Sequence, residues 1–223
     1  QVLDPAAGYQ TTRQFAYGPD RNLQDIAFDA QGEACVSCYD TAELLRIDPA
    51  DGAILGVIST AAFADADGLP ETGWLLMARG LLFVTCERLD RDHWYQPVGD
   101  SYLLVLDPTT EQWVDCDPAS PGVDGVRLAG ADPYGEPRRD GDRILVPCLA
   151  NYTLADGGVD VVDAVGLVSL GFEITEAQLG GDVLDVELGP DGRRHAIVSD
   201  ASFRTAVKWY DPSLADVDLV LTQ

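Results

Sequence analysis

The stretch Leu45-Arg46-Ile47-Asp48-Pro49-Ala50-Asp51-Gly52 decides the fold, because its centre, an apolar residue followed by Asp and usually Pro, recurs. The five copies are Leu3-Asp4-Pro5, Ile47-Asp48-Pro49, Leu106-Asp107-Pro108, Val162-Asp163-Ala164 and Tyr210-Asp211-Pro212. Their starts are separated by 44, 59, 56 and 48 residues. Asp can cap its own turn through its carboxylate, and Pro presets the backbone angle of the next position. Each copy is therefore predicted to be a hairpin turn in an array of repeated units.

A second pattern precedes each of the last four of these turns. It reads Val36-Ser37-Cys38, Val84-Thr85-Cys86, Val146-Pro147-Cys148 and Val198-Ser199-Asp200. A Gly-containing turn lies before each copy, as expected of tight hairpins: Gln31-Gly32, Arg79-Gly80, Asp140-Gly141 and Asp191-Gly192. Residues 168–174 alternate between apolar and other residues with the period of a strand, and no segment has a sustained helical period. Each unit is therefore predicted to have four strands.

Four-stranded antiparallel units that repeat at roughly 40 to 50 residues are typical of β-propeller blades. We therefore predict an all-β fold in which residues 1–223 form a single β-propeller domain. The predicted units are a half-blade at 1–21 and full blades at about 22–60, 71–130, 136–175 and 181–223.

These turns resemble those of the YVTN/NHL-type bacterial propeller repeats, in which a strand ends in Asp-Pro-x-x-Gly. Residues 48–52 and 4–8 match that form, whereas residues 107–110 lack the Gly and Asp163 lacks the following Pro. The resemblance covers nearly the whole chain and implies the propeller fold. It names no activity, because such rings include binders, scaffolds and enzymes. It also implies an extracytoplasmic location, since propellers of this type are often periplasmic, attached to the cell surface or secreted.

The predicted half-blade supplies only a third and a fourth strand. A ring left open would expose sheet edges, which proteins normally cover. We therefore expect further N-terminal blades, giving a ring of six or seven, or a second chain that completes the ring. The alternative is a ring of about five blades whose first unit has two strands.

The chain is strongly acidic, with 38 Asp and Glu residues against 14 Lys and Arg residues and a net charge of −24. This balance disfavours binding to nucleic acid or to anionic membranes, because no basic patch is present. It favours cationic partners, among which Ca²⁺ is possible, and no other cofactor is indicated. No stretch approaches the ~20 apolar residues of a transmembrane helix.

Three of the five cysteines, Cys38, Cys86 and Cys148, occupy the same position in successive units. Ring geometry would separate them by on the order of 10 Å, whereas a disulfide needs Cα atoms ~4.4–6.8 Å apart. We therefore interpret them as small hydrophobic residues packed between blades.

Two units carry insertions between the second pattern and the Asp-Pro turn. That distance is 10, 21, 15 and 11 residues in successive units, so the long loops are 87–101 and 149–158. Equivalent connections emerge on the same rim of a propeller, and loops often carry function. Arg, Trp and Tyr are enriched where proteins bind partners. We expect this rim to contact a protein partner or a small ligand through Arg88, Arg91, His93, Trp94, Tyr95 and Tyr152. The alternative is that Trp94 and Tyr95 only pack locally.

A candidate metal site combines Asp65, Asp67 and Glu71 with Asp182 near the central channel. The spacing of the first three does not match an EF-hand, and a solvated turn is the alternative interpretation. Propeller lactonases hold a metal near the ring axis, but their ligand set does not align with this chain.

The sequence lacks G-x-S-x-G, P-loop, H-E-x-x-H and dinucleotide-binding motifs. The leading hypothesis is therefore a non-enzymatic, extracytoplasmic propeller that acts as a binding scaffold through the rim with the long loops. The alternatives are a metal-dependent hydrolase or lactonase with acids at the central channel, and a structural subunit of a larger extracellular assembly.

Overall fold

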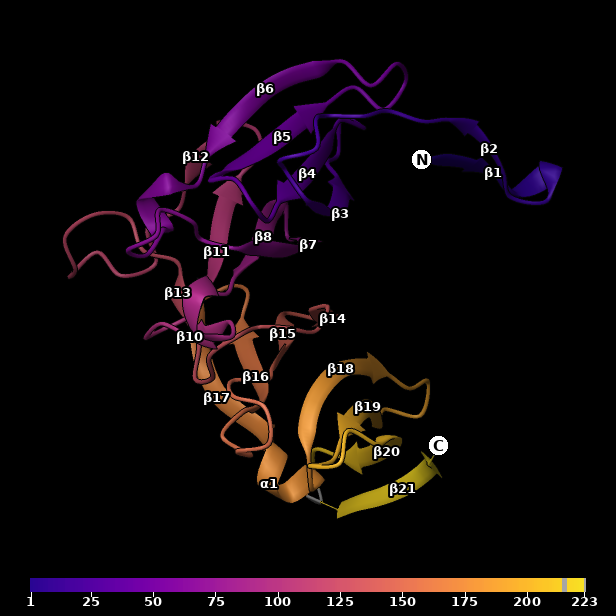
Figure 1. Cartoon of the computed structure of the whole chain (residues 1–223), viewed down its shortest axis with the longest axis vertical. Coiled ribbons are helices and arrows are strands. Elements are labelled where there is room, and N and C mark those ends of the chain that lie inside the picture. The colour runs from indigo at the N-terminus through magenta and orange to yellow at the C-terminus, as the bar shows by residue number, and fades with distance from the viewer. Residues whose placement is uncertain (214–215, 223) are drawn as a thin grey trace.

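The computed structural model describes residues 1–213 and 216–222, and their regular secondary structure consists almost entirely of antiparallel strands (Figure 1). The first sheet contains β3 (Leu23–Phe28), β4 (Ala34–Cys38), β5 (Glu43–Ile47) and β6 (Ile54–Ser59). The second contains β7 (Thr72–Ala78), β8 (Leu81–Cys86), β11 (Tyr102–Asp107) and β12 (Gln112–Trp113), and β13 (Val126–Arg127) also pairs with β11.

The third sheet contains β14 (Arg138–Asp140), β15 (Arg143–Cys148), β16 (Gly158–Asp163) and β17 (Val168–Thr175). The fourth contains β18 (Asp182–Leu188), β19 (Arg194–Ser199), β20 (Thr205–Asp211) and β21 (Asp216–Thr222). Residues 214, 215 and 223, which belong to the last predicted blade, lie outside the described residues. Apart from β13, which pairs with β11, the strands of these four sheets follow chain order, so each sheet is a meander.

Shorter elements connect or precede these sheets. A separate hairpin of β1 (Val2–Asp4) and β2 (Gln10–Arg13) extends away from the first sheet (Figure 1). The loop after β8 contains β9 (Leu89–Asp90) and β10 (Gln96–Pro97), which pair with each other. The helical turns are η1 (Pro5–Ala7), η2 (Ala61–Phe63), η3 (Arg91–His93) and α1 (Glu176–Leu179). No described helix has the length and apolar character needed to cross a membrane.

All five repeated Asp residues cap their turns as predicted. In each copy, Oδ1 of the Asp accepts a hydrogen bond from the backbone N–H two residues later. The donors are the N–H groups of Ala6, Ala50, Thr109, Val165 and Ser213, at 2.7–2.9 Å. Asp163 forms this bond without a following Pro, so the carboxylate rather than the Pro ring is the constant part of the turn.

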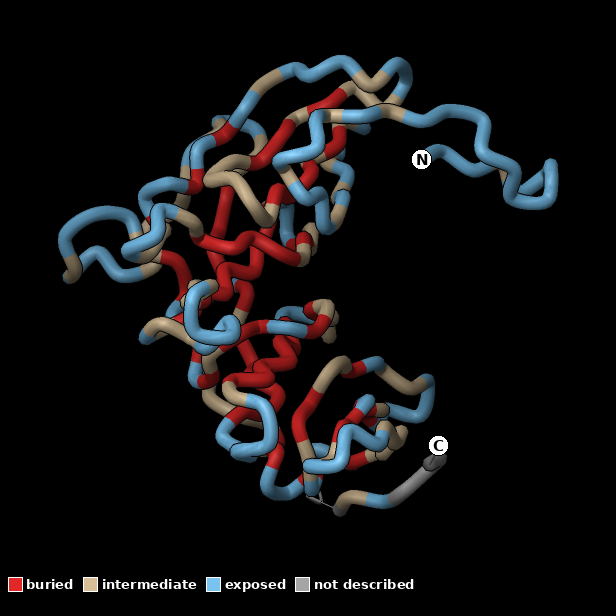
Figure 2. Tube along the Cα trace, viewed as in Figure 1, coloured by how far each residue is buried: buried red, intermediate tan, exposed pale blue. Residues whose placement is uncertain are grey.

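The sheets stand side by side in an arc, with the first strands β3, β7, β14 and β18 towards its concave side (Figure 1). In the first three sheets the buried residues concentrate in the two central strands, and in the fourth they concentrate in β18 and β19 (Figure 2). Contacts between β3 and β7, and between β15 and β18, join successive sheets. One direct tie is the hydrogen bond from the N–H of Leu75 on β7 to Oδ2 of Asp25 on β3, at 2.9 Å.

The three repeated cysteines lie in separate hydrophobic clusters. Cys38, Cys86 and Cys148 are fully buried free thiols, each among aliphatic residues between or within sheets. Burial raises the pKa of the Cys38 thiol to about 11, so the group stays protonated at neutral pH. These positions fit the interpretation of the cysteines as small hydrophobic residues.

Candidate functional site

A pocket of about 530 Å³ is lined by residues of the first, second and fourth sheets (β3, β7 and β18), of both long loops and of the segment 132–136 before β14. Six aromatic side chains contribute to it: Tyr39, Trp74, Trp94, Tyr95, Tyr134 and Tyr152. Four acidic side chains contribute as well: Glu87, Asp132, Glu136 and Asp185. Within the described part of the chain, no Arg, Lys or His lines it. The pocket is therefore both aromatic and electronegative.

The loop 87–101 brings Trp94 and Tyr95 to the pocket through a capped helical turn. The Asp90 carboxylate accepts hydrogen bonds from the N–H groups of Asp92 and His93, at 3.0 and 3.1 Å, and so starts η3. Trp94 and Tyr95 follow with φ angles of 62° and 56°, in the left-handed region that residues with a side chain rarely adopt. The chain reverses there, and Trp94 stands 93% exposed at the pocket.

Arg91 anchors the same loop to the first and second sheets. Its Nε lies 2.8 Å from Oε1 of the fully buried Glu71, and its Nη1 lies 2.6 Å from Oδ1 of Asp40. Its Nη2 also donates to the backbone oxygen of Tyr39 at 3.0 Å. The N–H of Leu89 adds a 3.2 Å hydrogen bond to Oε2 of Glu71. Arg91 thus fixes the loop that carries Trp94, rather than lining the pocket itself.

Two other predicted rim residues also point elsewhere. The Arg88 guanidinium lies over the Tyr102 ring, 5.7 Å from its centroid, and Nη1 donates to the backbone oxygen of Asp100 at 3.1 Å. The exposed His93 ring pairs with Asp90 of its own loop, with Nδ1 2.7 Å from Oδ2. Neither side chain belongs to the lining of the pocket.

The second long loop, 149–158, brings Tyr152 to the pocket. Its position depends on Asp182 at the start of β18, whose two carboxylate oxygens accept hydrogen bonds from the N–H of Thr153 at 2.9 and 3.0 Å. The Tyr152 ring lies 6.4 Å from the ring of Phe203, which belongs to the turn between β19 and β20. Three of the six predicted rim residues, Trp94, Tyr95 and Tyr152, therefore meet at one pocket.

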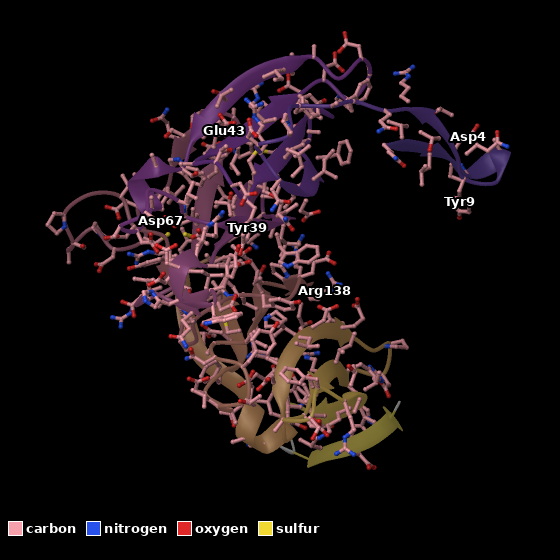
Figure 3. All side chains as sticks on the ribbon, in the orientation of Figure 1. Asp4, Tyr9, Tyr39, Glu43, Asp67 and Arg138 are labelled. Atoms are coloured by element: carbon pink, nitrogen blue, oxygen red, sulfur yellow. The ribbon has the colours of Figure 1, made fainter. Side chains whose placement is uncertain are left out.

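The four predicted metal-binding acids do not form one cluster. Oδ1 of Asp65 accepts from the N–H of Asp67 at 3.1 Å within the loop between β6 and β7. Glu71 is bound by Arg91, and Asp182 by Thr153. In Figure 3, Asp67 lies towards the convex side of the arc and away from Arg138, which lies at the concave side. Among the described residues, no group of three or more His, Cys, Asp or Glu side chains could hold a metal ion.

The two most buried acids of the pocket, Glu87 and Asp132, are not among the site residues predicted from the sequence. Glu87 is 7% exposed, and its Oε2 accepts a 2.6 Å hydrogen bond from the Tyr39 hydroxyl. Asp132 is 5% exposed, and its Oδ1 has no hydrogen-bond partner. The only available signal was that Glu87 directly follows the second repeated pattern, at the start of the longest loop.

Burial shifts the ionisation of both acids. It raises the pKa of Glu87 well above its usual value, and the charge of Asp132 contributes in the same direction. Burial, together with the charge of Glu176, raises the pKa of Asp132 to about 7. Both shifts reflect the cost of holding a carboxylate charge away from water. At the edge of the pocket, Glu136 and Asp185 face the Arg138 guanidinium instead, at 2.5 and 3.8 Å.

Three solved structures with similar folds place this architecture among known proteins. Hydrazine synthase from Kuenenia stuttgartiensis aligns over 95% of this chain and 53% of its own, with a TM-score of 0.59 and 14% identity. A protein of unknown function from Bacteroides caccae aligns over 97% of this chain and 66% of its own, with a TM-score of 0.53 and 13% identity. A Lactobacillus plantarum protein aligns over 90% of this chain and 54% of its own, with a TM-score of 0.52 and 14% identity.

The chain thus spans between 53% and 66% of the length of these three proteins. No protein-family model and no curated protein sequence matches it. The structural neighbours are β-propeller proteins, and at this level of identity the likeness concerns the fold alone. The predicted fold class is confirmed: the chain is an all-β protein built from the four-stranded antiparallel sheets of a β-propeller.

Proposed function

We propose that this chain is a non-enzymatic binding module that holds a small ligand on the rim formed by loops 87–101 and 149–158. The observation that carries the proposal is the convergence of Trp94 and Tyr95 with Tyr152 on one pocket. The volume of about 530 Å³ lies within the range of small-molecule sites. Extracytoplasmic action and kinship with YVTN/NHL-type repeats belong to the same proposal, which the Asp-Pro turns support.

The anchoring of the two loops supports a preformed site. Arg91 ties the first loop to Glu71 and Asp40, and Asp182 ties the second loop through Thr153. A loop that is already fixed loses little conformational entropy when a ligand binds. The exposure of Trp94 without a covering contact is the expected condition of an aromatic side chain that packs on a ligand.

The test is a thermal-shift screen of the purified chain with amines, carboxylates, neutral aromatics and sugars. We expect at least one class to stabilise the protein and to lose that effect when Trp94 and Tyr95 are both changed to Ala. The control is Tyr9→Ala, which removes an exposed aromatic ring from the distant β1–β2 hairpin (Figure 3). The proposal fails if no class binds, or if every hit survives the double substitution.

A second candidate is a subunit of a larger assembly, in which another sheet covers the first sheet. Its supporting observation is the apolar surface of β3 and β6, where Ile26, Phe28 and Val57 are 45%, 53% and 53% exposed. Light scattering over a range of concentrations tests it, with Phe28→Asp expected to abolish any self-association. A metal-dependent hydrolase has less support, since its four candidate ligands do not gather in one cluster among the described residues.

A further inference from the structure

We propose that the pocket binds a small organic ammonium ion, with Glu87 and Asp132 as its counter-charges and the surrounding aromatic rings as its cage. This inference rests on the proposed binding function and narrows its ligand to one chemical class. It depends on three features of the pocket: two buried acids without cationic partners, a lining rich in aromatic rings, and an acidic mouth.

The first feature emerges from a comparison of the buried acids. The side chain of Glu173 is 4% exposed and pairs with Arg143 and Arg194. Six further acidic residues are buried among the described residues: Glu71, Glu87, Asp132, Asp160, Glu176 and Asp182. Four of these receive strong donors. Glu71 is bound by Arg91 and the N–H of Leu89, and Asp182 by the N–H of Thr153.

The remaining two of those four are bound in the same manner. Asp160 accepts from the N–H of Ala129 at 2.6 Å and from the Ser169 hydroxyl at 2.7 Å. Glu176 accepts from the N–H groups of Gly157 and Val183 at 2.9 and 2.8 Å. These bonds join different strands and loops, so each of the four acids has a structural role.

Glu87 and Asp132 differ from the other four, and both line the pocket. The partner of Glu87 is a neutral phenol, that of Tyr39, and Oδ1 of Asp132 has no partner. Within the described residues, neither forms an ion pair within 4.0 Å. A buried carboxylate without a donor destabilises a protein. A cation in the pocket would provide the positive partner that both carboxylates lack.

The aromatic lining decides which kind of cation fits. An ammonium group is attracted to the faces of aromatic rings, and the lining offers six such rings: Tyr39, Trp74, Trp94, Tyr95, Tyr134 and Tyr152. A bare divalent metal requires several oxygen ligands at short range, and no described cluster of three or more acidic, His or Cys side chains offers them. An anion would meet four acidic side chains and no basic one. The lining therefore favours an organic ammonium ion over either alternative.

The negative charge at the opening of the pocket and over the whole chain also favours a cationic ligand. Glu136 and Asp185 stand at the pocket, and the chain carries a net charge of −24. Such a field concentrates cations near the opening and raises their rate of association. Arg138 pairs with both acids from outside the lining, so it holds them in place without occupying the pocket.

The experiment is calorimetric titration of the full chain with choline and with benzyltrimethylammonium. The matched uncharged probe is 3,3-dimethyl-1-butanol, in which carbon replaces the nitrogen of choline. We expect at least one of the two ammonium probes to bind. If choline binds, its neutral isostere should bind at least about tenfold more weakly. Asp132→Asn and Glu87→Gln should each weaken ammonium binding by about tenfold or more.

Asp20→Asn is the control, because it removes the same charge from an exposed position that does not line the pocket. Its affinity for the probes should equal that of the unaltered chain. Equal binding of choline and its isostere, or unchanged ammonium binding by both pocket variants, overturns the inference. If both ammonium probes fail while a neutral compound binds in a Trp94-dependent manner, the ammonium inference fails and the binding function stands. If no compound binds, both fail. Thermal unfolding of each variant confirms that it is folded.

Discussion

The buried acids of this protein fall into two groups that occupy different regions. Glu71, Asp160, Glu176 and Asp182 lie between strands and loops, where an Arg, a hydroxyl or backbone N–H groups bind them. Glu87 and Asp132 lie at the pocket, where donors are few. Residue type and burial are the same in both groups, so only the partners differ. A carboxylate bound by several donors or by Arg holds elements together, whereas one with a single phenol partner or with an unpartnered oxygen costs stability and is available to a ligand.

The largest effect is expected from Glu71, which joins the first long loop to the sheets. Glu71→Ala leaves Arg91 without its buried partner and the N–H of Leu89 without its acceptor. Breaking a buried ion pair from one side should lower the free energy of unfolding by about 3–5 kcal/mol. Urea unfolding measures this loss. Glu136→Ala, at a half-exposed pair with Arg138, should cost less than about 1 kcal/mol. Equal losses from the two variants would contradict the distinction.

Asp132→Asn should raise the free energy of unfolding, whereas Glu71→Ala lowers it. It removes a buried charge whose Oδ1 has no partner, so we expect the free energy of unfolding to rise by about 1–3 kcal/mol above pH 7. The matched comparison is Asp160→Asn, which disturbs a carboxylate bound by Ala129 and Ser169 and should lower stability. A loss of stability in Asp132→Asn would place Asp132 in the first group and remove the contrast.

The pH dependence of stability sharpens the same contrast. The pKa of Asp132 is about 7 in the folded chain and 3.8 as the reference value, so its ionisation destabilises the fold above pH 7. That penalty declines as the pH falls through 7 and is absent below about pH 4. The titratable groups that interact with Asp132 are Glu87, Glu176, the phenols of Tyr39 and Tyr152, and the thiol of Cys148. Burial also raises the pKa of Glu176 to about 7, so the wild-type curve alone would mix both acids.

The measurement is therefore a difference between two proteins. Unfolding free energies of the unaltered chain and of Asp132→Asn are compared from about pH 8 to about pH 5. The advantage of the variant should be greatest at the alkaline end and should shrink steadily towards the acidic end. A difference that stays constant with pH would show that Asp132 does not titrate in this range.

The smallest effect on stability is expected at Trp94, an exposed aromatic residue of the pocket lining. Trp94 is 93% exposed, so Trp94→Ala should change the free energy of unfolding by no more than about 0.5 kcal/mol. Trp113 is the control, because its ring packs edge-on against Phe63 at 5.0 Å and its Nε1 donates to the backbone oxygen of Ser59 at 2.9 Å. Trp113→Ala should cost about 1–3 kcal/mol. Chemical unfolding compares the two, and a large loss at Trp94 would indicate a packing role instead.

Much of the fold could be predicted because the repeated residues form hydrogen bonds with their near neighbours in the chain. Asp48 and its four equivalents cap their turns within two residues of themselves, so sequence alone is enough to find them. Loop length was equally visible, and it pointed to Trp94, Tyr95 and Tyr152. Arg88, Arg91 and His93 belong to the same loop as Trp94. Their side chains contact Tyr102, Glu71 and Asp90, respectively, and not the pocket. The composition of the loop could not predict which of its side chains would make such contacts.

The sequence by itself determined the units, their turns and the loops that exceed the repeat, because each depends on residues adjacent along the chain. Only the tertiary structure decided which acids are held by Arg or backbone N–H groups and which lie at the pocket without a cationic partner. Glu87 and Tyr39 are 48 residues apart in the chain, and they meet because neighbouring sheets pack side by side. Burial and pairing depend on such distant contacts, and they convert two ordinary carboxylates into the distinctive feature of the pocket.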